Sequence, residues 1–428
     1  MQLKIKILSL IFIFAAIICG CSPDESTHAN SNNAEKIQAN INAVREDSGA
    51  PPKNFDAEEK VEVAENSTPN IETPNTEIAE VQNVAVDDIE QILNSMKLEE
   101  KIGQMMIFGF HGTTMNDDIN WMFNQCHMGG VILFDRNMEN KAQVKALTES
   151  LQAGRKIPLF IALDEEGGIV SRMANDLTPP PSQQEIGKSG DSSLAYSSAN
   201  SISQELKNIG INLNFAPVAD VGTPDTRSFS DDANIVAEFV SQAAKGYEDA
   251  GIFYTLKHFP GIGLWNVDSH QDIETIVADR YTFDTVDLVP FKKIINERDN
   301  SKFMIMVSHY KYTAFDAENS ATLSPAVMTE LLRNELGFKG VIITDDLDMG
   351  AVSKYHDERY LSVASVKAGA DIVLSCHEYE KQRKMYEGVL EAVKRGEISE
   401  ERINESVRRI LKMKQAGRIL SAGNNSAI

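Results

Sequence analysis

The stretch that decides the fold is Lys257-His258-Phe259-Pro260-Gly261-Ile262-Gly263, which comes directly after the apolar run Ile252–Leu256. The pattern predicts a buried strand that ends in a cluster of cationic residues and glycines. Asp268-Ser269-His270 follows within a few residues. Loops that carry reactive side chains directly after buried strands are typical of barrel enzymes, whose active sites lie at the carboxyl ends of the strands.

The Asp268-Ser269-His270 triplet is a candidate proton-transfer group. A histidine two residues after an aspartate can be held by that carboxylate in one tautomer and can exchange a proton with a substrate oxygen. An isolated triplet of this kind is also compatible with an ordinary solvated loop. The neighbouring Lys257-His258 pair and the two glycines favour the catalytic interpretation.

After residue 86, short apolar runs alternate with amphipathic segments, which is the pattern of strand–helix units and a parallel sheet. The strands are expected at Gln104–Phe110, Gly129–Phe134, Leu159–Leu163, Ile211–Phe215, Ile252–Leu256, Phe303–Val307, Gly340–Thr344 and Asp371–Leu374. The expected helices include Asn140–Gly154, Leu194–Ile209, Ala233–Ala250, Val286–Glu297, Pro325–Leu336 and Tyr360–Ala368. Eight such units predict an α/β fold with a single (β/α)8 TIM-barrel-like catalytic domain.

An open doubly wound sheet is the competing fold. Polar residues recur just after the strands, at Asp135-Arg136-Asn137, Asp164-Glu165-Glu166, Asp220, Lys257-His258, Ser308-His309, Asp345-Asp346 and Cys376-His377. A closed barrel would bring all of these ends to one face, whereas an open sheet would spread them along a line. The recurrence therefore favours the barrel.

The start of the chain resembles a bacterial lipoprotein signal. Lys4 and Lys6 precede the apolar run Ile7–Ile18, which is short for a membrane span, and Cys21 follows as the expected lipidated residue. We expect a signal peptide over 1–21, a disordered acidic and polar tether over 22–85, the barrel over 86–418 and a short tail over 419–428. The expected location is the extracytoplasmic side of the cell membrane, with secretion as the alternative.

The composition and the motifs of the chain argue against several classes of partner and cofactor. The net charge of -22 argues against a nucleic-acid partner. Cys126 and Cys376 have no metal-ligand spacing around them, and the chain lacks the motifs of phosphate-binding loops, serine hydrolases and zinc helices. We therefore expect no metal and no cofactor.

Asp345-Asp346-Leu347-Asp348 follows the apolar run Gly340–Thr344. A carboxylate at the end of a barrel strand can act as a nucleophile, a base or a metal ligand, and an ion-paired structural cluster is the alternative. Because successive strand residues face opposite ways, only one of Asp345 and Asp346 should point to the barrel axis. The spacing does not say which.

Two further loops carry candidate substrate-binding groups. Asp164 lies next to the hinge Gly167-Gly168, with Arg172 a few residues on, and carboxylates and guanidinium groups suit sugar hydroxyls and amide oxygens. Arg227 lies in the long loop after the fourth expected strand. Glu165 and Glu166 are equally compatible with surface charges and are not singled out.

Taken together, these stretches resemble the glycoside hydrolase family 3 β-N-acetylhexosaminidases of the NagZ type. The resemblance rests on Leu98–Gln104, Gly129–Phe134, Asp164–Gly168, Asn214–Asp220, Lys257–Gly261, Asp268–His270 and Thr344–Leu347. It implies Asp345 as the nucleophile and His270 as the acid/base, held by Asp268. It also implies an N-acetylglucosamine ring bound by Asp164, Arg172, Arg227, Lys257 and His258.

The family usually has a second histidine where this chain has Ile262, which puts the fine positioning of that loop in question. About ten residues follow the helix that is expected to end near Gly417, so the barrel itself is expected to supply the proton donor.

The resemblance thus predicts a lipid-anchored exo-β-N-acetylhexosaminidase that acts on peptidoglycan fragments or chitooligosaccharides through a covalent glycosyl-enzyme intermediate. A phosphorylase or a β-glucosidase on the same fold and a non-enzymatic sugar-binding lipoprotein remain open as alternatives.

Overall fold

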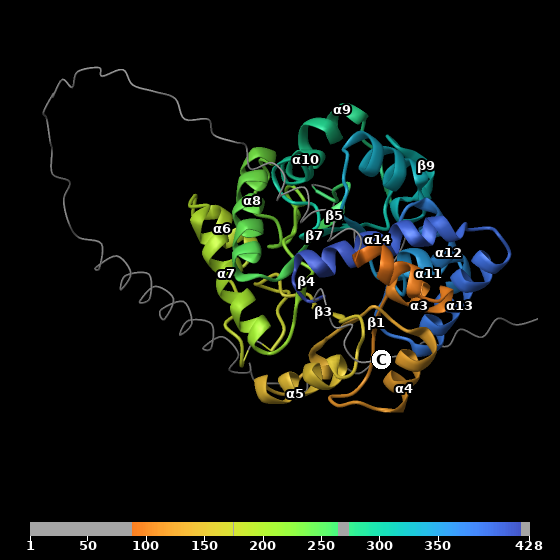
Figure 1. Cartoon of the computed structure of the whole chain (residues 1–428). Coiled ribbons are helices and arrows are strands. Elements are labelled where there is room, and N and C mark those ends of the chain that lie inside the picture. Colours follow the sequence, from red (N-terminus) through yellow and green to blue (C-terminus); the bar gives the residue numbers. More distant parts are fainter. Residues whose placement is uncertain (1–87, 174, 264–273, 421–428) are drawn as a thin grey trace, which may run out of the picture. The chain divides into compact units, whose positions relative to one another are not determined.

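The computed structural model describes residues 88–173, 175–263 and 274–420 (Figure 1). Its main sheet has eight strands in the order β10-β7-β5-β4-β3-β2-β1-β11, and all neighbouring strands run parallel. These are β1 (Met106–Gly109), β2 (Gly130–Ile132), β3 (Phe160–Leu163), β4 (Leu213–Asn214), β5 (Phe253–Phe259), β7 (Phe303–Val307), β10 (Val341–Thr344) and β11 (Val373–Ser375).

The two edges of the sheet meet. Ile343 of β10 forms a parallel bridge with Ile372, just before β11, and the Ile372 N–H donates to the Ile342 carbonyl at 3.0 Å. All residues of the eight strands are buried, which explains why they appear in the sequence as continuous apolar runs. The predicted (β/α)8 barrel is confirmed.

One predicted strand boundary is wrong in a way that matters for the site. β5 does not end at Leu256 but continues through Lys257 and His258 to Phe259, with a register shift beside β7. The ladder continues because the Lys257 carbonyl accepts the Ala219 N–H at 2.7 Å and the Phe259 carbonyl accepts the Ser308 N–H at 3.0 Å. Lys257 and His258 are therefore strand residues rather than loop residues.

β4 is shorter than predicted because side chains replace part of its backbone ladder. Asn212 Oδ1 accepts the Ile161 N–H at 2.8 Å, and Asn214 Oδ1 accepts the Glu165 N–H at 2.9 Å. The two asparagines thus hold β3 and its following loop in place, while the paired strand itself spans Leu213–Asn214.

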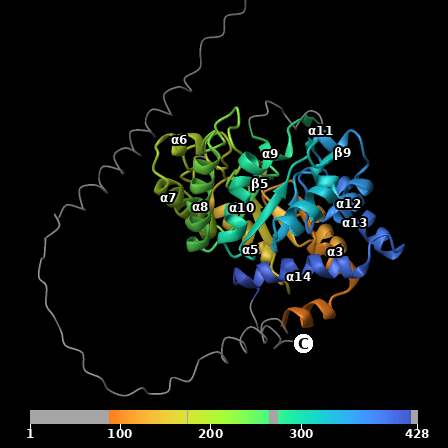
Figure 2. The same cartoon turned by 90° about the horizontal axis from the view of Figure 1, so that it is seen from above.

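Helices surround the barrel (Figures 1 and 2). They are α3 (Leu98–Gln104), α4 (Asp117–Trp121), α5 (Lys141–Gln152), α6 (Gln183–Lys188), α7 (Ser193–Asn208), α8 (Ala233–Ala250), α9 (Arg280–Thr282), α10 (Leu288–Glu297), α11 (Gly350–Ser353), α12 (Glu358–Ala368), α13 (Tyr379–Lys394) and α14 (Glu400–Ala416). Met122–Cys126, Phe283–Asp287 and Ala326–Glu335 are π-helical, and Asp135–Asn137 and Ala321–Leu323 are 3₁₀ turns. Among the described residues, no helix is both long and apolar enough to span a membrane.

α8 shows why the helix predictions succeeded. Asp232 caps its first turn by accepting the Asn234 and Ile235 N–H groups, and Gly251 ends it with a φ of 74°. Its bounds are those predicted from the sequence. The predicted helix Pro325–Leu336 instead has π-type hydrogen bonding, because the Leu336 N–H reaches back to the Leu331 carbonyl.

The two ends of the barrel carry different elements. A small sheet of β6 (Thr275–Ile276), β8 (Lys311–Tyr312) and β9 (Asp316–Ser320) follows the carboxyl ends of β5 and β7 along the chain. Figure 2 shows α9, α11 and β9 at one end of the molecule and α3 and α14 at the opposite end. α14 closes the end at which the strands begin, where Lys414 donates to the carbonyl of Gly129, the residue before β2.

Candidate active site

Six of the predicted site residues lie at or near the carboxyl ends of neighbouring barrel strands. Asp164 follows β3, Lys257 and His258 lie in β5 just before its final residue Phe259, Asp345 follows β10, and Arg172 and Arg227 lie in the loops after β3 and β4. Asp268, His270 and Cys21 lie outside the described residues. The structure therefore places the expected nucleophile and sugar-binding groups and leaves the expected acid/base untested.

Four charged side chains form the centre of the site. The Lys257 ammonium lies 2.8 Å from Asp164 Oδ1 and 2.6 Å from Glu166 Oε1. Arg227 donates Nε and Nη2 to the two oxygens of Glu166, at 2.8 and 2.9 Å. Because two cations face two carboxylates, the cluster is electrically balanced without a ligand.

Glu166 is the residue that sequence reasoning missed. It is buried, and burial alone would raise its pKa, but Lys257 and Arg227 outweigh burial and lower the pKa to about 2. A signal was present, since residues two apart in an extended segment point to the same side. Asp164 and Glu166 share such a side, and both contact Lys257.

Glu165 points elsewhere and has a different character. It is fully buried, and Oε2 accepts the Arg172 N–H at 2.7 Å. Burial raises the pKa of this carboxyl to about 7. Glu165 therefore fixes the backbone of the loop that carries Arg172, and it is not a surface charge.

The imidazole of His258 is held in one orientation by two partners. Nδ1 lies 2.7 Å from Asp220 Oδ2, and Nε2 lies 3.4 Å from Arg227 Nη2. Because a guanidinium group can only donate, Nε2 is the acceptor and Nδ1 carries the proton that Asp220 binds. His258 thus carries a proton on Nδ1, on the side of Asp220.

Asp345 is the member of the aspartate pair that belongs to this cluster. Oδ1 accepts the Asp346 N–H at 2.8 Å. Burial would raise the pKa of Asp345, but His309, His258, the Asp346 N–H and Lys257 together lower it below its ordinary value. Asp345 is therefore ionised at neutral pH, as a nucleophilic carboxylate must be.

Asp346 faces the loop after β11 instead. Oδ1 accepts the N–H groups of Asp348 and Cys376 at 3.0 and 3.1 Å, and Oδ2 lies 3.4 Å from His377 Nε2. Burial, followed by the charge of Asp348, raises the pKa of Asp346 to about 8. The two adjacent aspartates thus have opposite protonation preferences, which the spacing in the sequence left open.

Arg172 lies beside Asp164 at the rim of the site. Its Nη2 is 3.8 Å from Asp164 Oδ2 and its Nη1 is 3.7 Å from Asp135 Oδ2, while its guanidinium lies 5.5 Å from the centre of the Phe134 ring. Within the described part of the chain, its buried Nε has no hydrogen-bond partner. The guanidinium is thus partly available for a substrate oxygen.

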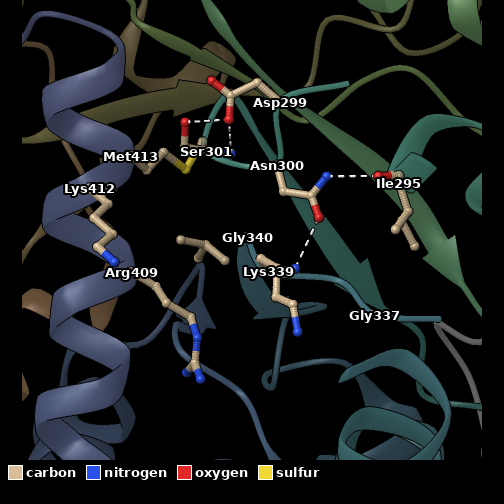
Figure 3. Close-up of a pocket in the computed structure, with 11 residues that line it drawn as sticks. Ile295, Asp299, Asn300, Ser301, Gly337, Lys339, Gly340, Arg409, Lys412 and Met413 are labelled. Carbon is tan, nitrogen blue, oxygen red and sulfur yellow. Dashed lines mark hydrogen bonds between the residues drawn. The ribbon is translucent and has the colours of Figure 1, made fainter. Parts of the chain in front are cut away.

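A cavity elsewhere on the barrel is not part of this site. It measures about 470 Å³ and lies at the end where the strands begin, between the start of β10 and α14. Figure 3 shows it lined by Asp299, Asn300, Ser301, Lys339, Arg409 and Lys412, with Asn300 bonded to the Lys339 backbone. It contains none of the predicted site residues, and its lysines are exposed. The charged cluster therefore marks the candidate active site at the opposite end of the barrel, and the volume of this cavity does not mark it.

In the described part of the chain, no group of three or more histidine, cysteine, aspartate or glutamate side chains is arranged to hold a metal ion. The arrangement at the carboxyl ends of the strands combines an ionised carboxylate with balanced cations and hydrogen-bond donors. Such a set of groups can bind a polyhydroxylated ligand and can attack an electrophilic carbon.

Comparison with known proteins agrees with this chemistry. The model of the glycosyl hydrolase family 3 N-terminal domain matches residues 97–413. A beta-hexosaminidase A from Pseudoalteromonas piscicida is 34% identical over 335 residues, which are 71% of this chain and 56% of that protein. A beta-hexosaminidase from Nitrosomonas eutropha is 34% identical over 290 residues, 65% of this chain and 81% of the relative.

A solved structure is also similar. It is a glycoside hydrolase family 3 beta-N-acetylglucosaminidase from Paenibacillus sp. str. FPU-7, which superposes with a TM-score of 0.74 at 38% sequence identity. The match covers 78% of this chain and 65% of that one. The chain thus spans little more than half of the Pseudoalteromonas relative and about two thirds of the Paenibacillus structure.

Proposed function

The chain belongs to glycosyl hydrolase family 3, and from that premise we propose that it is a glycoside hydrolase, a retaining exo-β-N-acetylhexosaminidase. It would release non-reducing N-acetylglucosamine from peptidoglycan fragments or chitooligosaccharides. The observation that carries the proposal is the ionised Asp345 beside the balanced cluster of Lys257, Asp164, Glu166 and Arg227. The β-hexosaminidase relatives support the choice of sugar.

In the first step, a carboxylate oxygen of Asp345 attacks the anomeric carbon. A C–O bond to Asp345 forms while the bond to the leaving-group oxygen breaks, and that oxygen takes a proton from the acid/base residue. In the second step, water gives its proton back to the acid/base and displaces Asp345 from the sugar. The low pKa of Asp345 suits both steps, because an ionised carboxylate attacks well and leaves well.

His270, held by Asp268, is proposed as the acid/base on the strength of the family resemblance. A histidine can donate and accept a proton near neutral pH without placing a second negative charge beside Asp345. Two carboxylates at close range would raise one another's pKa and compromise the nucleophile. No metal or cofactor takes part in this scheme.

Sugar binding is proposed for Asp164, Arg172, Arg227, Lys257 and His258. The ion pairs of the site support a neutral ligand, because Lys257 and Arg227 already have carboxylate partners and do not call for an anion. Asp164 keeps one oxygen beside the Arg172 guanidinium, at 3.8 Å. Hydroxyl and acetamido groups can accept from such donors and donate to such a carboxylate.

The location of the enzyme is proposed from the start of the sequence. A lipid on Cys21 and a tether over 22–85 would hold the barrel at the extracytoplasmic side of the cell membrane. Peptidoglycan fragments are available at such a surface. Radiolabelled palmitate incorporation in the wild type, and its loss in Cys21→Ala, would test the anchor.

The first experiment measures hydrolysis of 4-nitrophenyl N-acetyl-β-glucosaminide and of the matching β-glucoside by the full chain. We expect preference for the acetamido sugar and a product that is first released as the β-anomer by NMR. Preference for the glucoside would identify a β-glucosidase, and a strict requirement for added phosphate would identify a phosphorylase. Inactivity on both sugars with measurable N-acetylglucosamine binding would favour the binding-protein alternative.

A further inference from the structure

The turn Pro260–Gly263, which follows β5, rests on a buried aspartate. Asp220 is fully buried, and its Oδ1 accepts the N–H groups of His258 and Ile262 at 3.1 and 3.0 Å. Its Oδ2 binds His258 Nδ1 at 2.7 Å. One carboxylate therefore fixes both the turn and the imidazole that is proposed to contact the substrate.

A second buried aspartate packs against the same turn. Asp287 ends the π-helical segment before α10 and is 3% exposed. A Cβ atom at Gly261 would lie 2.6 Å from Asp287 Cβ, and one at Gly263 would lie 2.6 Å from Asp287 Oδ1. Gly261 also has a φ of +126°. The two glycines thus let the turn lie directly on Asp287, and any larger residue would push the two apart.

We propose that Asp287 is a positioning residue for the reaction. It packs against the turn Pro260–Gly263 and, together with Asp220, sets the orientation and tautomer of His258. The inference rests on the proposed function in one respect, because His258 is there assigned to substrate binding. Asp287 itself is not assigned any contact with the substrate. Its effect passes through Asp220 and the turn.

The charges of Asp220 and Asp287 make the packing of the turn depend on pH. Burial, followed by the charge of Asp220, raises the pKa of Asp287 to about 7. Below that pH a neutral Asp287 lies beside Asp220, so that the burial of two adjacent negative charges is avoided. Among the described residues, His258 from β5 and Tyr312 from β8 also face the pair, and the pKa of Tyr312 is raised by burial and by both aspartates.

Above pH 7 the balance changes. An ionised Asp287 adds a second negative charge next to Asp220, at the face on which the turn rests. Because like charges at close range repel, the ionised pair is expected to hold the turn, and through Asp220 the His258 imidazole, less firmly. Activity is therefore expected to fall as the pH rises through about 7.

The test compares two variants of the full chain, Asp287→Asn and Asp287→Ala, over pH 5 to 9. Asp287→Asn keeps the shape and stays neutral, so kcat at pH 6 should stay within about twofold of the wild type and the decline above pH 7 should be smaller. Asp287→Ala leaves space under the turn and should lower kcat about 10- to 100-fold, since a small misplacement of a site group has an effect of this size. An Asp287→Asn variant whose kcat–pH curve coincides with that of the wild type would overturn the inference.

Asp284→Asn is the matched control. Asp284 belongs to the same π-helical segment but is paired at the surface with Arg280 and Lys292, at 2.9 Å each. This substitution should leave the kcat–pH curve unchanged. If Asp284→Asn changed the kcat–pH curve as Asp287→Asn does, any acidic residue of the segment would affect the pH dependence, and Asp287 would have no specific role.

NMR of the His258 imidazole nitrogens separates this inference from the proposed function. In the wild type and in Asp287→Asn, the signals should report one fixed imidazole with a proton on Nδ1, whereas Asp287→Ala should shift them toward a mixture. If the wild type failed to hydrolyse the glycoside, the proposed function would fail and these signals would still decide the role of Asp287. Unchanged signals in Asp287→Ala would refute it.

Discussion

A buried lysine at the closed end of the barrel gives the sharpest prediction on stability. Lys414 of α14 is fully buried, and its ammonium group donates to Gln104 Oε1 at 2.8 Å and to the Gly129 carbonyl at 3.0 Å. The Phe160 ring centre lies 4.7 Å from the nitrogen. No carboxylate pairs with it in the described part of the chain, and burial lowers the pKa of Lys414 from 10.5 to about 7.

The sign of the pH dependence follows from this lowered pKa. Between pH 7 and 10.5 the unfolded chain holds a proton on Lys414 that the folded protein has released, so stability rises with pH across that range. At 1.36 kcal/mol for each pKa unit, and with half of the folded molecules still protonated at pH 7, the rise from pH 7 to pH 9 is about 2 kcal/mol.

The assay compares the wild type with Lys414→Met by urea unfolding at pH 7, 8 and 9. Methionine leaves two carbonyl acceptors unpaired, which costs about 1–3 kcal/mol each, but that cost does not depend on pH. Between pH 7 and 9, the free energy of unfolding should therefore rise by about 2 kcal/mol more in the wild type than in the variant. Lys412→Met, an exposed position of the same helix, should show no such change of slope. Parallel pH curves for the wild type and Lys414→Met would mean that Lys414 stays charged in the fold, and the reasoning would fail.

Four further predictions concern the catalytic end of the barrel and the opposite end, at which the strands begin. Asp345→Ala should lower kcat by on the order of 10⁴ with the circular dichroism spectrum unchanged, and near-normal turnover would remove its role as nucleophile. His270→Ala should reduce kcat for unactivated oligosaccharides about 10²-fold more than for nitrophenyl glycosides, and equal losses would remove its role as acid. Glu166→Gln should cost about 3 kcal/mol of stability at pH 7. The difference from the wild type should shrink as the pH falls from 4.5 toward 2, because the unfolded chain then takes up a proton on Glu166 that the folded protein does not, which denaturation at pH 7 and pH 3 can measure. Asp371→Asn should destabilise by about 3–5 kcal/mol, because it binds three arginines, and should leave KM unchanged because it lies at the other end of the barrel; a raised KM would contradict this separation.

The fold was predictable because each of its elements has a local signature. Every barrel strand is a short, fully buried run, and β7 has the bounds that its apolar residues predict. α8 begins after a capping aspartate and ends at a glycine, and both signals are visible in the sequence. The errors occur where side chains replace backbone hydrogen bonds, as Asn212 does beside β4, or where a polar strand end continues the ladder, as at Lys257.

That Asp164, Lys257 and Arg227 lie together was predictable from the sequence, and their pairings were not. Asp164, Lys257 and Arg227 were expected on one face, but Glu166, which binds both Lys257 and Arg227, was not, because these contacts join the segment after β3 to β5 and to the loop after β4. The support of His258 by Asp220 likewise joins β5 to the segment after β4. Such contacts are set by the three-dimensional arrangement, and no local pattern encodes them.

The carboxyl groups at the carboxyl ends of the barrel strands fall into two groups, those whose pKa is lowered and those whose pKa is raised by their surroundings. Glu166 and Asp345 lie beside cations or hydrogen-bond donors, and their pKa values are lowered despite burial. Glu165 and Asp346, their neighbours in the sequence, also accept backbone N–H groups, but burial outweighs these bonds and raises their pKa values to about 7 and about 8. Since alternate residues of an extended chain face opposite sides, one strand end can present an ionised carboxylate to the barrel axis and hide a protonated one behind it. Two adjacent acids then place one negative charge at the reaction centre instead of two, and that single charge is what a nucleophile working beside a separate proton donor requires.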